Sequence, residues 1–359
     1  MRVLLVPSLR LEGWKAMDRY AAALARELPR VLPDDWSVTT LRNPNFPHWA
    51  RFAARWLLYP RTIDWSDWDV VHVLDHSYAH VLHRRRGQAR TVVTVHDLWA
   101  CESAARKPGL RGAVLRRVNA WVLTGLRRAD VCLCDSRATL AALARHFPEV
   151  APRARHEMLG IDPGFFLRQP SVARRRGRDF LGVPGDAVVV LHVGSCAPRK
   201  NLAALLGAIS RLVPAHPSLC MVQVGGQFAA AEHALIAHLG LTDRVRQHSS
   251  VPDDTLPNVY AAADVVAVPS LFEGFGLPVL EAFAVGTPVV ATRTTALADF
   301  PEALVYSAGQ GSVDEIAQGL RSVLADRAAA LARAAAAREW ARDKTWENVA
   351  RTTAHAYAG

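Results

Sequence analysis

The feature that most constrains the fold is a pattern that occurs twice along this chain of 359 residues. Residues 2–8 and 187–194 are short apolar runs, each bounded by Pro or Gly and rich in β-branched side chains. Each run precedes a polar turn and then a helical pattern, at 17–28 in the first half and at 202–212 in the second. Such runs are typical of parallel strands that are buried on both faces. Each half therefore begins like a βαβ unit.

Strand and helix patterns continue to alternate in both halves, which favours two doubly wound parallel sheets in series. We expect further strands at 69–74, 91–95, 131–134, 220–224, 265–268 and 288–291. We expect further helices at 113–126, 137–146, 229–238, 256–262, 279–285 and 326–342.

The length of the chain is about twice that of a common single domain. Half of its residues are hydrophobic, as in globular proteins. We therefore predict an α/β protein with domains over 1–168 and 180–335 and a C-terminal helical segment over 336–359, able to cross back to the first domain. The stretch 163–185 interrupts the strand and helix pattern, which predicts a flexible linker between the domains.

Several classes of protein do not fit the composition. The five cysteines include no C-x-x-C pair, so neither a disulfide framework nor a zinc site is indicated. Apolar stretches such as 187–191 are far shorter than the roughly 20 residues that span a bilayer. The N-terminus lacks the apolar segment and cleavage site of a signal peptide. These features together predict a cytoplasmic protein.

The net charge of +10 lies entirely in the first half. Residues 1–170 hold 26 Lys and Arg against 16 Asp and Glu, whereas 171–359 hold 17 of each kind. This asymmetry suggests an anionic partner for the first half, such as an acidic membrane surface, a diphosphate-bearing acceptor or nucleic acid. Arginine used for solubility is the alternative. The basic stretches are 46–56, Arg84–Arg86 and 99–117, the last with Arg106, Lys107, Arg111, Arg116 and Arg117.

The segment S-L-F-E-G-F-G-L-P-V-L-E-A at 270–282 follows a predicted strand and precedes a predicted helix. Gly274 and Gly276 let the backbone approach a ligand, and the amides at the start of the helix favour an anion. Glu273 and Glu281 could accept hydrogen bonds from hydroxyls at both ends of a nucleotide sugar. A surface glutamate and a second one that complements the helix dipole are the alternative.

The segment L-H-V-G-S-C-A-P-R-K-N-L at 191–202 is again a strand, a turn and the start of a helix. Arg199 and Lys200 lie where two cations could bind a diphosphate, Arg as a fork and Lys as a point charge. A solvated basic turn is the alternative. The presence of both motifs in one half favours the diphosphate.

These motifs resemble those of the retaining glycosyltransferases of family 4. The family's two glutamates, separated by seven residues, match Glu273 and Glu281, and its V-G-x-x-x-P-R-K-N segment matches 193–201. Weaker matches follow in the expected order at 93–99, 134–136, 159–166, 221–226 and 249–264, so the resemblance covers most of the chain. It implies the GT-B architecture of two facing Rossmann-like doubly wound domains with a C-terminal helix. The first would bind the acceptor and the second the nucleotide sugar.

The resemblance also implies roles for individual residues. Arg199 and Lys200 would bind the donor diphosphate, and Glu281 the ribose. Val251 would contact the base through its backbone, and His96 would complete the sugar pocket. The implied catalytic residues are His96, Arg199, Lys200 and Glu273, and the implied donor-binding residues are Gly13, Arg199, Lys200, Val251, Glu273, Gly274, Phe275, Gly276, Leu277 and Glu281.

The first turn departs from the family pattern. Many members have paired glycines there, whereas this chain has Glu12 and Gly13. Close approach of the backbone to the phosphates is therefore expected at Gly13 only. A Glu12 carboxylate near a diphosphate would be unfavourable unless it points elsewhere.

The expected reaction transfers a hexose from a nucleoside-diphosphate sugar to a saccharide or lipid-linked saccharide acceptor with retention, as in bacterial polysaccharide biosynthesis. GDP-mannose is favoured, with UDP- and dTDP-sugars as alternatives. No cofactor and no metal are expected, since Asp67 and Asp69 precede a strand where a structural role is favoured, and Asp253 and Asp254 are predicted to cap a helix. An inverting reaction with His96 or Asp97 as general base is the mechanistic alternative.

The sequence allows three other functions to be considered. The basic charge allows a nucleic-acid-binding protein, but no recognition motif accompanies it. Two Rossmann-like domains would suit a dehydrogenase, but no strand is followed by G-x-G-x-x-G. An inactive relative is disfavoured because His96 and both glutamates are present. We expect no nucleic acid as partner, and a location in the cytoplasm that includes peripheral contact with the inner face of the membrane.

Overall fold

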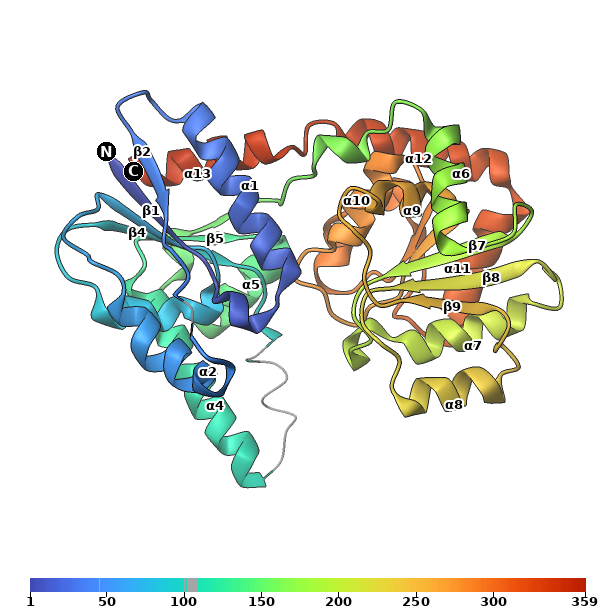
Figure 1. Cartoon of the computed structure of the whole chain (residues 1–359), viewed down its shortest axis with the longest axis horizontal. Coiled ribbons are helices and arrows are strands. Elements are labelled where there is room, and N and C mark those ends of the chain that lie inside the picture. Colours follow the sequence, from blue (N-terminus) through green and yellow to red (C-terminus); the bar gives the residue numbers. More distant parts are fainter. Residues whose placement is uncertain (45, 100, 102–108) are drawn as a thin grey trace. The chain divides into compact units, whose positions relative to one another are not determined.

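A computed structural model describes residues 1–44, 46–99, 101 and 109–359 (Figure 1). The chain divides into two compact units, which we call unit 1 and unit 2. Unit 1 contains Met1–Gly160 and Thr345–Gly359, and unit 2 contains Ile161–Lys344. The C-terminal residues thus belong to unit 1, and its boundary with unit 2 comes before the predicted residue 168.

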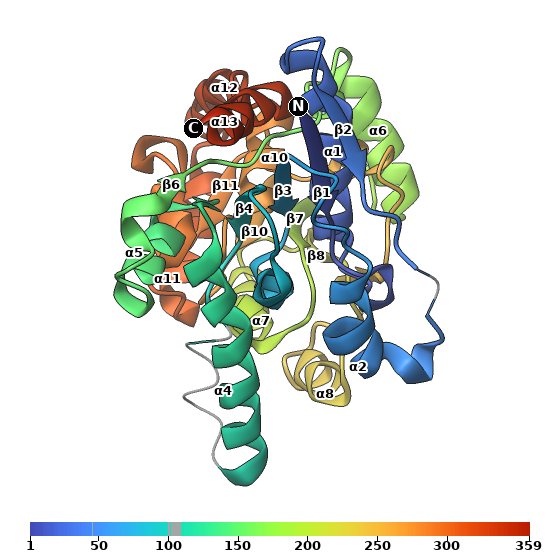
Figure 2. The same cartoon turned by 90° about the vertical axis from the view of Figure 1, so that its left-hand side faces the viewer.

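Unit 1 is built on a six-stranded parallel sheet of the order β2-β1-β3-β4-β5-β6 among its described residues. Its strands are β1 Arg2–Val6, β2 Ser37–Thr40, β3 Val70–Val73, β4 Arg90–Val95, β5 Val131–Cys134 and β6 Ala154–His156. Its helices are α1 Lys15–Val31, α2 Arg51–Ala53, α4 Gly109–Thr124, α5 Arg137–His146 and α13 Trp346–Ala358, with a long 3-10 helix, η5, at His76–Arg84. The helices cover the sheet on both of its faces (Figures 1 and 2).

Unit 2 has a second six-stranded parallel sheet among its described residues, of the order β12-β11-β10-β7-β8-β9. Its strands are β7 Val188–Val193, β8 Leu219–Val224, β9 Val245–His248, β10 Val265–Val268, β11 Val289–Ala291 and β12 Tyr306–Ser307. Its helices are α6 Pro170–Leu181, α7 Leu202–Leu212, α8 Ala230–His238, α9 Leu256–Ala262, α10 Leu277–Val285, α11 Val313–Ala325 and α12 Arg327–Ala341. The predicted α/β fold class is confirmed.

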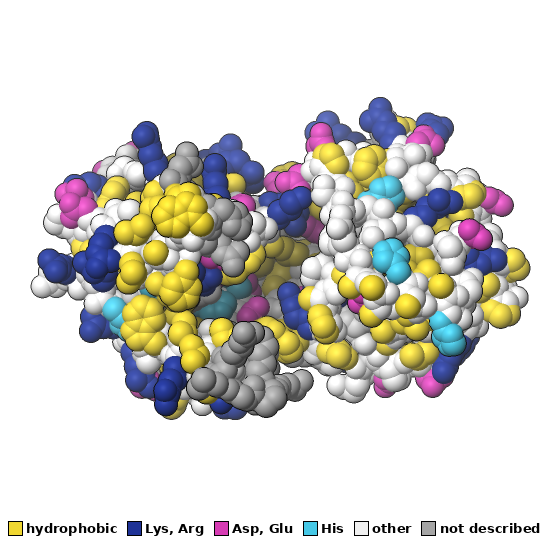
Figure 3. Space-filling model, turned by 60° about the horizontal axis from the view of Figure 1, so that its bottom comes forward, with side chains coloured by type: hydrophobic (Ala, Val, Ile, Leu, Met, Phe, Trp, Pro, Cys, Tyr) yellow, Lys and Arg dark blue, Asp and Glu magenta, His cyan; other side chains and the backbone are white. Residues whose placement is uncertain are grey.

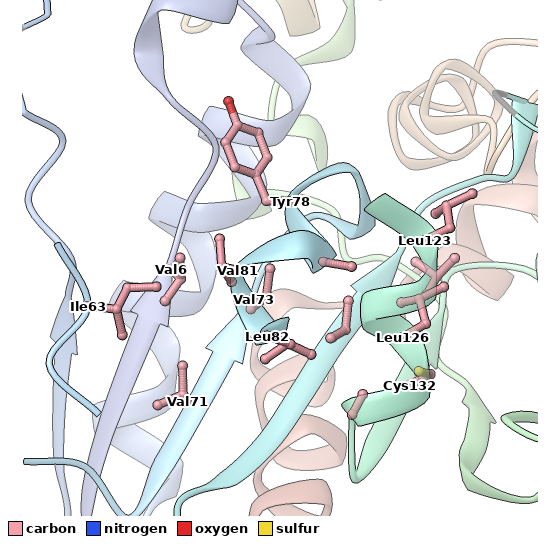
Figure 4. Packing of buried hydrophobic residues seen from close by; sticks show 14 of the residues in the cluster. Val6, Ile63, Val71, Val73, Tyr78, Val81, Leu82, Leu123, Leu126 and Cys132 are labelled. Atoms are coloured by element: carbon pink, nitrogen blue, oxygen red, sulfur yellow. The ribbon is translucent and has the colours of Figure 1, made fainter. Parts of the chain in front are cut away.

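Each sheet has its own hydrophobic core. In unit 1 valines of the central strands pack against η5 and the end of α4, and Figure 4 shows Val6, Val71, Val73, Tyr78, Val81, Leu82, Leu123 and Leu126 in this cluster. In unit 2 α7 buries Leu202, Leu205, Leu206, Ile209 and Leu212. Their spacing of three and four residues places them on one face of the helix.

The linker predicted at 163–185 is wrong, because α6 occupies most of it and packs on α9. Although the sequence of α6 is rich in arginine, the helix has a buried face that includes Ala173 and Leu181. Arg178 is also buried, and its guanidinium donates to carbonyl oxygens of Ala262 and Pro184 at 3.2 and 3.0 Å. Arg178 therefore helps to hold α6 in place.

The C-terminal helix α13 is anchored to unit 1 through buried polar contacts. The Tyr357 hydroxyl lies 2.8 Å from Nδ1 of His72, a residue of β3. The Thr353 hydroxyl lies 3.0 Å from a carboxylate oxygen of Glu157. Arg90 in β4 donates to the carbonyl oxygen of Ala356. Among the residues that the structure describes, no helix has the length and hydrophobicity to cross a bilayer.

Candidate active site

Two loops of unit 2 meet at the carboxyl ends of neighbouring strands. β7 leads into residues 194–201, and β10 leads into residues 269–276. β7 and β10 are adjacent in the sheet, but the chain continues from β7 to one side of the sheet and from β10 to the other. Such a point, where the strand order reverses, is where open α/β sheets bind ligands. The two sequence motifs therefore lie together.

A buried ionic cluster joins the two loops. Nζ of Lys200 lies 2.5 Å from Oε1 of Glu273, and a guanidinium nitrogen of Arg199 lies 3.4 Å from Oε2. Lys200 and Glu273 are both buried, whereas the Arg199 side chain is 30% exposed. Arg199, Lys200 and Glu273 are thus brought together, and their two positive charges exceed the single negative charge.

The cluster keeps Glu273 ionised. Burial, the largest single influence, would raise the pKa of this carboxyl group, but the Lys200 ammonium, the Arg199 guanidinium and the Ser270 hydroxyl together outweigh burial and lower the pKa below its ordinary value. Hydroxyl groups from the same region complete the contacts. Ser270 donates to Oε1 of Glu273 at 2.8 Å, and the backbone N–H of Glu273 donates to Oγ1 of Thr295 at 2.9 Å.

The glycine loop leads directly into α10. Gly276 is the N-terminal flanking residue of this helix and has a φ of 102°, a conformation that L side chains rarely adopt. A Cβ at this position would also lie 2.7 Å from a methyl carbon of Leu297. The turn 274–277 therefore requires glycine at 276 to bring the chain into α10. A glycine at this position is also what the predicted close approach of the backbone to a ligand would need.

Glu281 lies inside α10 and is buried. Its Oε2 accepts a hydrogen bond of 2.5 Å from the hydroxyl of Tyr260, a residue of α9. Tyr260 thereby holds the carboxylate in one position. Val251 lies in the loop between β9 and α9, at the same edge of the sheet. The assignment of Val251 to the base and of Glu281 to the ribose stays a prediction.

In unit 1 the Glu12 carboxylate has a positively charged partner. Gly13 ends a short 3-10 turn after β1, and the Glu12 carboxylate beside it points toward Arg55, whose Nη1 lies 3.1 Å from Oε1. The Arg55 guanidinium also lies over the rings of Trp14, Trp56 and Tyr78. The negative charge of Glu12 is therefore compensated within unit 1.

His96 follows β4 in unit 1 and is buried. Its Nδ1 lies 2.6 Å from Oδ2 of Asp135 and its Nε2 lies 2.8 Å from the carbonyl oxygen of Leu74, so both ring nitrogens have protein partners. Burial, the largest single influence, would lower the pKa of His96, but the carboxylates of Asp135 and Asp75 and the Leu74 carbonyl oxygen together outweigh it and raise the pKa to about 9. His96 is therefore held as a cation at neutral pH.

Two further sequence predictions have definite outcomes. Asp69 accepts a hydrogen bond from the backbone N–H of Arg2 at 2.6 Å, which confirms a structural role before β3. The prediction that Asp253 and Asp254 cap a helix is wrong. α9 begins after Thr255, and no side chain caps it. The two aspartates lie in the preceding turn, one residue or more too early to bind the free amides of the first helical turn.

The sequence motifs missed several residues that hold the site in place. His192 at the end of β7 lies 2.7 Å from the side-chain oxygen of Gln223 in β8, and the Gln223 amide donates to the carbonyl oxygens of Gly194 and Gly225 at 2.7 and 2.8 Å. These contacts fasten the start of the 194–201 loop. The signal was a polar residue inside each of two apolar strand patterns, where burial demands a hydrogen-bond partner.

Comparison with known proteins agrees with this organisation. Residues 17–162 match the family described as Glycosyltransferase Family 4, and residues 173–340 match the family described as Glycosyl transferases group 1. The D-inositol 3-phosphate glycosyltransferase of Corynebacterium jeikeium is 40% identical over 217 residues, which are 58% of this chain and 50% of that protein. The chain spans about half the length of the first curated relatives that it matches.

Two further similarities extend over more of the chain. The O-antigen chain mannosyltransferase B of Escherichia coli is 29% identical over 309 residues, which are 84% of this chain and 78% of that protein. The structure of Anabaena HepE in complex with UDP and glucose aligns over the full length of both chains with a TM-score of 0.76 at 20% identity. This structural likeness shows the GT-B fold. With its two motif-bearing loops in unit 2 and both family matches along its length, the chain belongs to the family 4 glycosyltransferases.

Proposed function

We propose that this protein transfers a hexose, mannose from GDP-mannose, to a saccharide or lipid-linked saccharide acceptor, with retention of configuration and without a metal ion. The observation that carries the proposal is the ionic cluster of Arg199, Lys200 and Glu273 at the strand-order reversal of unit 2. Its excess positive charge suits the diphosphate of a nucleotide sugar.

The same excess charge supports the mechanism. As the bond between the anomeric carbon and the diphosphate breaks, negative charge grows on the leaving oxygen, and preorganised cations stabilise that charge. In the retaining reaction the acceptor oxygen bonds to the anomeric carbon from the leaving-group side, and the acceptor's proton passes to the departing diphosphate. Arg199 and Lys200 would supply the stabilisation without a divalent ion.

The inverting alternative needs a general base in unit 1. Both ring nitrogens of His96 already have partners, and Oδ1 of Asp97 accepts a hydrogen bond from the backbone N–H of Trp99 at 3.0 Å. These contacts make His96 a weak candidate to accept a proton, so we favour retention. The anomeric configuration of the product decides between the two.

The choice of donor is supported by similarity to the O-antigen mannosyltransferase. A UDP-sugar is the second candidate, because the similar structure of HepE contains UDP and glucose. The acceptor could be an inositol phosphate, as the name of the Corynebacterium relative suggests, or a growing glycan. We place the reaction on the cytoplasmic side, next to the membrane, where lipid-linked acceptors are accessible.

The test is incubation of the protein in EDTA with GDP-mannose, UDP-glucose or a dTDP-hexose, together with mannosides and inositol phosphates as acceptors. Proton NMR follows donor consumption and the anomeric signal of the product. We expect consumption of GDP-mannose and a product with the donor's anomeric configuration. Glu273→Gln should lose the activity, whereas the exposed control Glu302→Gln should keep it. Turnover of a UDP-sugar alone, an inverted product or a strict need for metal would each overturn the corresponding part of the proposal.

A further inference from the structure

One face of unit 1 exposes large hydrophobic side chains that unit 1 leaves uncovered. The helical segment 48–61 presents Trp49, Phe52 and Leu57 with 88, 73 and 55% of their surface exposed. Trp121 of α4 is 45% exposed. Exposed apolar side chains are ordinary when scattered singly, but a gathered set marks an interaction site. Figure 3 shows large hydrophobic side chains gathered on this side of unit 1.

Contacts between aromatic rings connect the two segments into one face. The Trp56 ring lies 6.0 Å from the Phe52 ring and 6.0 Å from the Trp121 ring, measured between centroids. His80 of η5 supports both tryptophans, with centroid distances of 4.8 Å to Trp56 and 5.5 Å to Trp121. Ring contacts inside unit 1 therefore hold the Phe52 and Trp121 rings in place. We call this surface, formed by 48–61 and 109–128, the aromatic face.

The charge of the aromatic face has one sign. Residues 48–61 contain three arginines and residues 109–128 contain five, and neither stretch contains Asp or Glu. Arg116 and Arg117 are exposed on α4. The nearby acid Glu12 is already paired with Arg55. An anionic partner therefore meets no repelling carboxylate within either stretch.

Helix α4 also combines exposed apolar side chains with arginines. This helix projects away from the sheet of unit 1 in both views (Figures 1 and 2). Val114 and Leu115 are 52 and 45% exposed, directly before Arg116 and Arg117. Arginine can keep its guanidinium at lipid phosphates while its stem and the neighbouring apolar side chains enter the acyl boundary.

We propose that the aromatic face inserts into the headgroup region of a bilayer rich in anionic lipids. Tryptophan is enriched at this level of a membrane, and each nearby arginine adds attraction to an anionic surface. A second copy of the chain fits less well, because two such faces would bring like charges together. Nucleic acid fits less well too, because exposed Leu57, Val114 and Leu115 have no counterpart on a phosphate backbone.

Not all of the basic stretches predicted from the sequence belong to this membrane surface. Arg85 is used internally, since its guanidinium donates to the carbonyl oxygen of Ala89 at 2.9 Å and pairs with Asp130 at 3.0 Å. It is therefore not part of the membrane surface. Arg106 and Lys107 lie outside the described residues. The membrane surface proposed here extends the proposed function and rests on it only for the place of the acceptor.

Flotation with lipid vesicles tests the proposal on the full chain without nucleotide. Phosphatidylcholine vesicles with phosphatidylglycerol should bind the protein, and vesicles of phosphatidylcholine alone should bind it much more weakly, with binding that falls as salt rises. The double variant Trp49→Ser/Phe52→Ser should lose about tenfold in partitioning. Its control is Leu331→Ser, which removes an exposed apolar side chain from unit 2 and should change nothing.

A second pair of variants separates charge from insertion. Arg116→Gln/Arg117→Gln should weaken binding to anionic vesicles about tenfold. The adjacent exposed arginines Arg175 and Arg176 of α6 provide the matched control, and their replacement by Gln should have no effect. All variants change exposed side chains, so unchanged melting temperatures are expected and show that each folds.

Several results would overturn the membrane surface. They are the absence of vesicle binding, equal losses in the controls, or a dimer that Trp49→Ser/Phe52→Ser abolishes while vesicle binding is unchanged. Failure of the proposed function is distinguishable, because vesicle binding without any sugar transfer would leave the membrane surface intact and count against the proposed donor and acceptors.

Discussion

At the scale of single residues, the ion pair of Lys200 and Glu273 connects stability with function. Each group is buried, and each is the principal charged partner of the other. A buried charge is tolerated only when it is paired and hydrogen-bonded. The pair therefore fastens the two loops together, while Arg199 remains partly exposed for a ligand.

Removal of one partner should be costly. We expect Lys200→Met and Glu273→Gln to abolish sugar transfer, and Lys200→Met to lower the free energy of unfolding by about 3 kcal/mol because it removes the principal charged partner of a buried carboxylate. The double variant Lys200→Met/Glu273→Gln should lose clearly less than the sum of the single losses. Urea unfolding of the four proteins measures this. Strictly additive losses would contradict a buried pair.

The sequence predicted the ionic residues but not how they are held. Arg199, Lys200 and Glu273 belong to contiguous motifs at strand ends, so their meeting follows from strand order. Gln223 and Tyr260 lie in apolar patterns without a motif, and their contacts to Gly194 and Glu281 depend on packing between elements. A single sequence does not specify such contacts.

At the scale of elements, the strands that the sequence missed are the four edge strands β2, β6, β9 and β12. None of their residues is buried. Central parallel strands are covered on both faces and therefore appear as continuous apolar runs, whereas edge strands need not. The eight strands predicted from apolar runs are all inside the sheets.

Helix α6 was missed for a different reason. Its sequence P-S-V-A-R-R-R-G-R-D-F-L is polar, and its central Gly177 looks like a helix breaker. In the structure this glycine permits close packing, because a Cβ would lie 1.9 Å from the carbonyl oxygen of Asn258 in α9. The stretch predicted as a linker thus contains the glycine that allows the two helices to approach.

The close packing at Gly177 predicts that adding one methyl group there lowers stability strongly. Gly177→Ala should lower the free energy of unfolding by about 3 kcal/mol, since the clash is with backbone and forces α6 and α9 apart. Gly185→Ala is the matched control, because a Cβ there meets nothing within 4 Å. Thermal unfolding of both variants measures the difference. Equal stability of the two would mean that α6 is not packed as described.

The docking of α13 predicts a dependence of stability on pH. Burial raises the pKa of Glu157 to about 8, and the nearby Asp135 carboxylate adds to this effect. Between the ordinary pKa of about 4.3 and this value, the folded state keeps a proton that the unfolded state has released. Stability must therefore fall as pH rises from about 4.5 to 8, and the loss stops above that range.

Replacement of the Glu157 carboxyl group by a neutral amide should remove this loss of stability with rising pH. Glu157→Gln should gain about 4 kcal/mol relative to wild type between pH 4.5 and pH 8. The exposed control Glu339→Gln should show no such change. Chemical unfolding at a series of pH values makes the comparison. A constant difference between Glu157→Gln and wild type over this range would show that Glu157 is ionised in the folded protein.

At the scale of the whole molecule, the chain joins two units, each with a six-stranded parallel sheet whose strand order reverses at one point. In unit 1 the reversal lies between β1 and β3, and in unit 2 between β7 and β10. The sequence predicted this twofold pattern from two matching strand starts. It did not show where one unit ends, because α12 and α13 form one polar, alanine-rich stretch that belongs to both units.

The most direct test of the account is a thermal-shift comparison with GDP, UDP, dTDP, ADP and NAD, performed without metal. A ligand that binds only the folded protein at about 100 times its dissociation constant adds roughly 2.7 kcal/mol of stability. We predict stabilisation by GDP that is strongly reduced in Glu281→Gln and unchanged in Glu302→Gln. No shift with any nucleoside diphosphate, or a shift with NAD alone, would contradict the assignment of the unit 2 site.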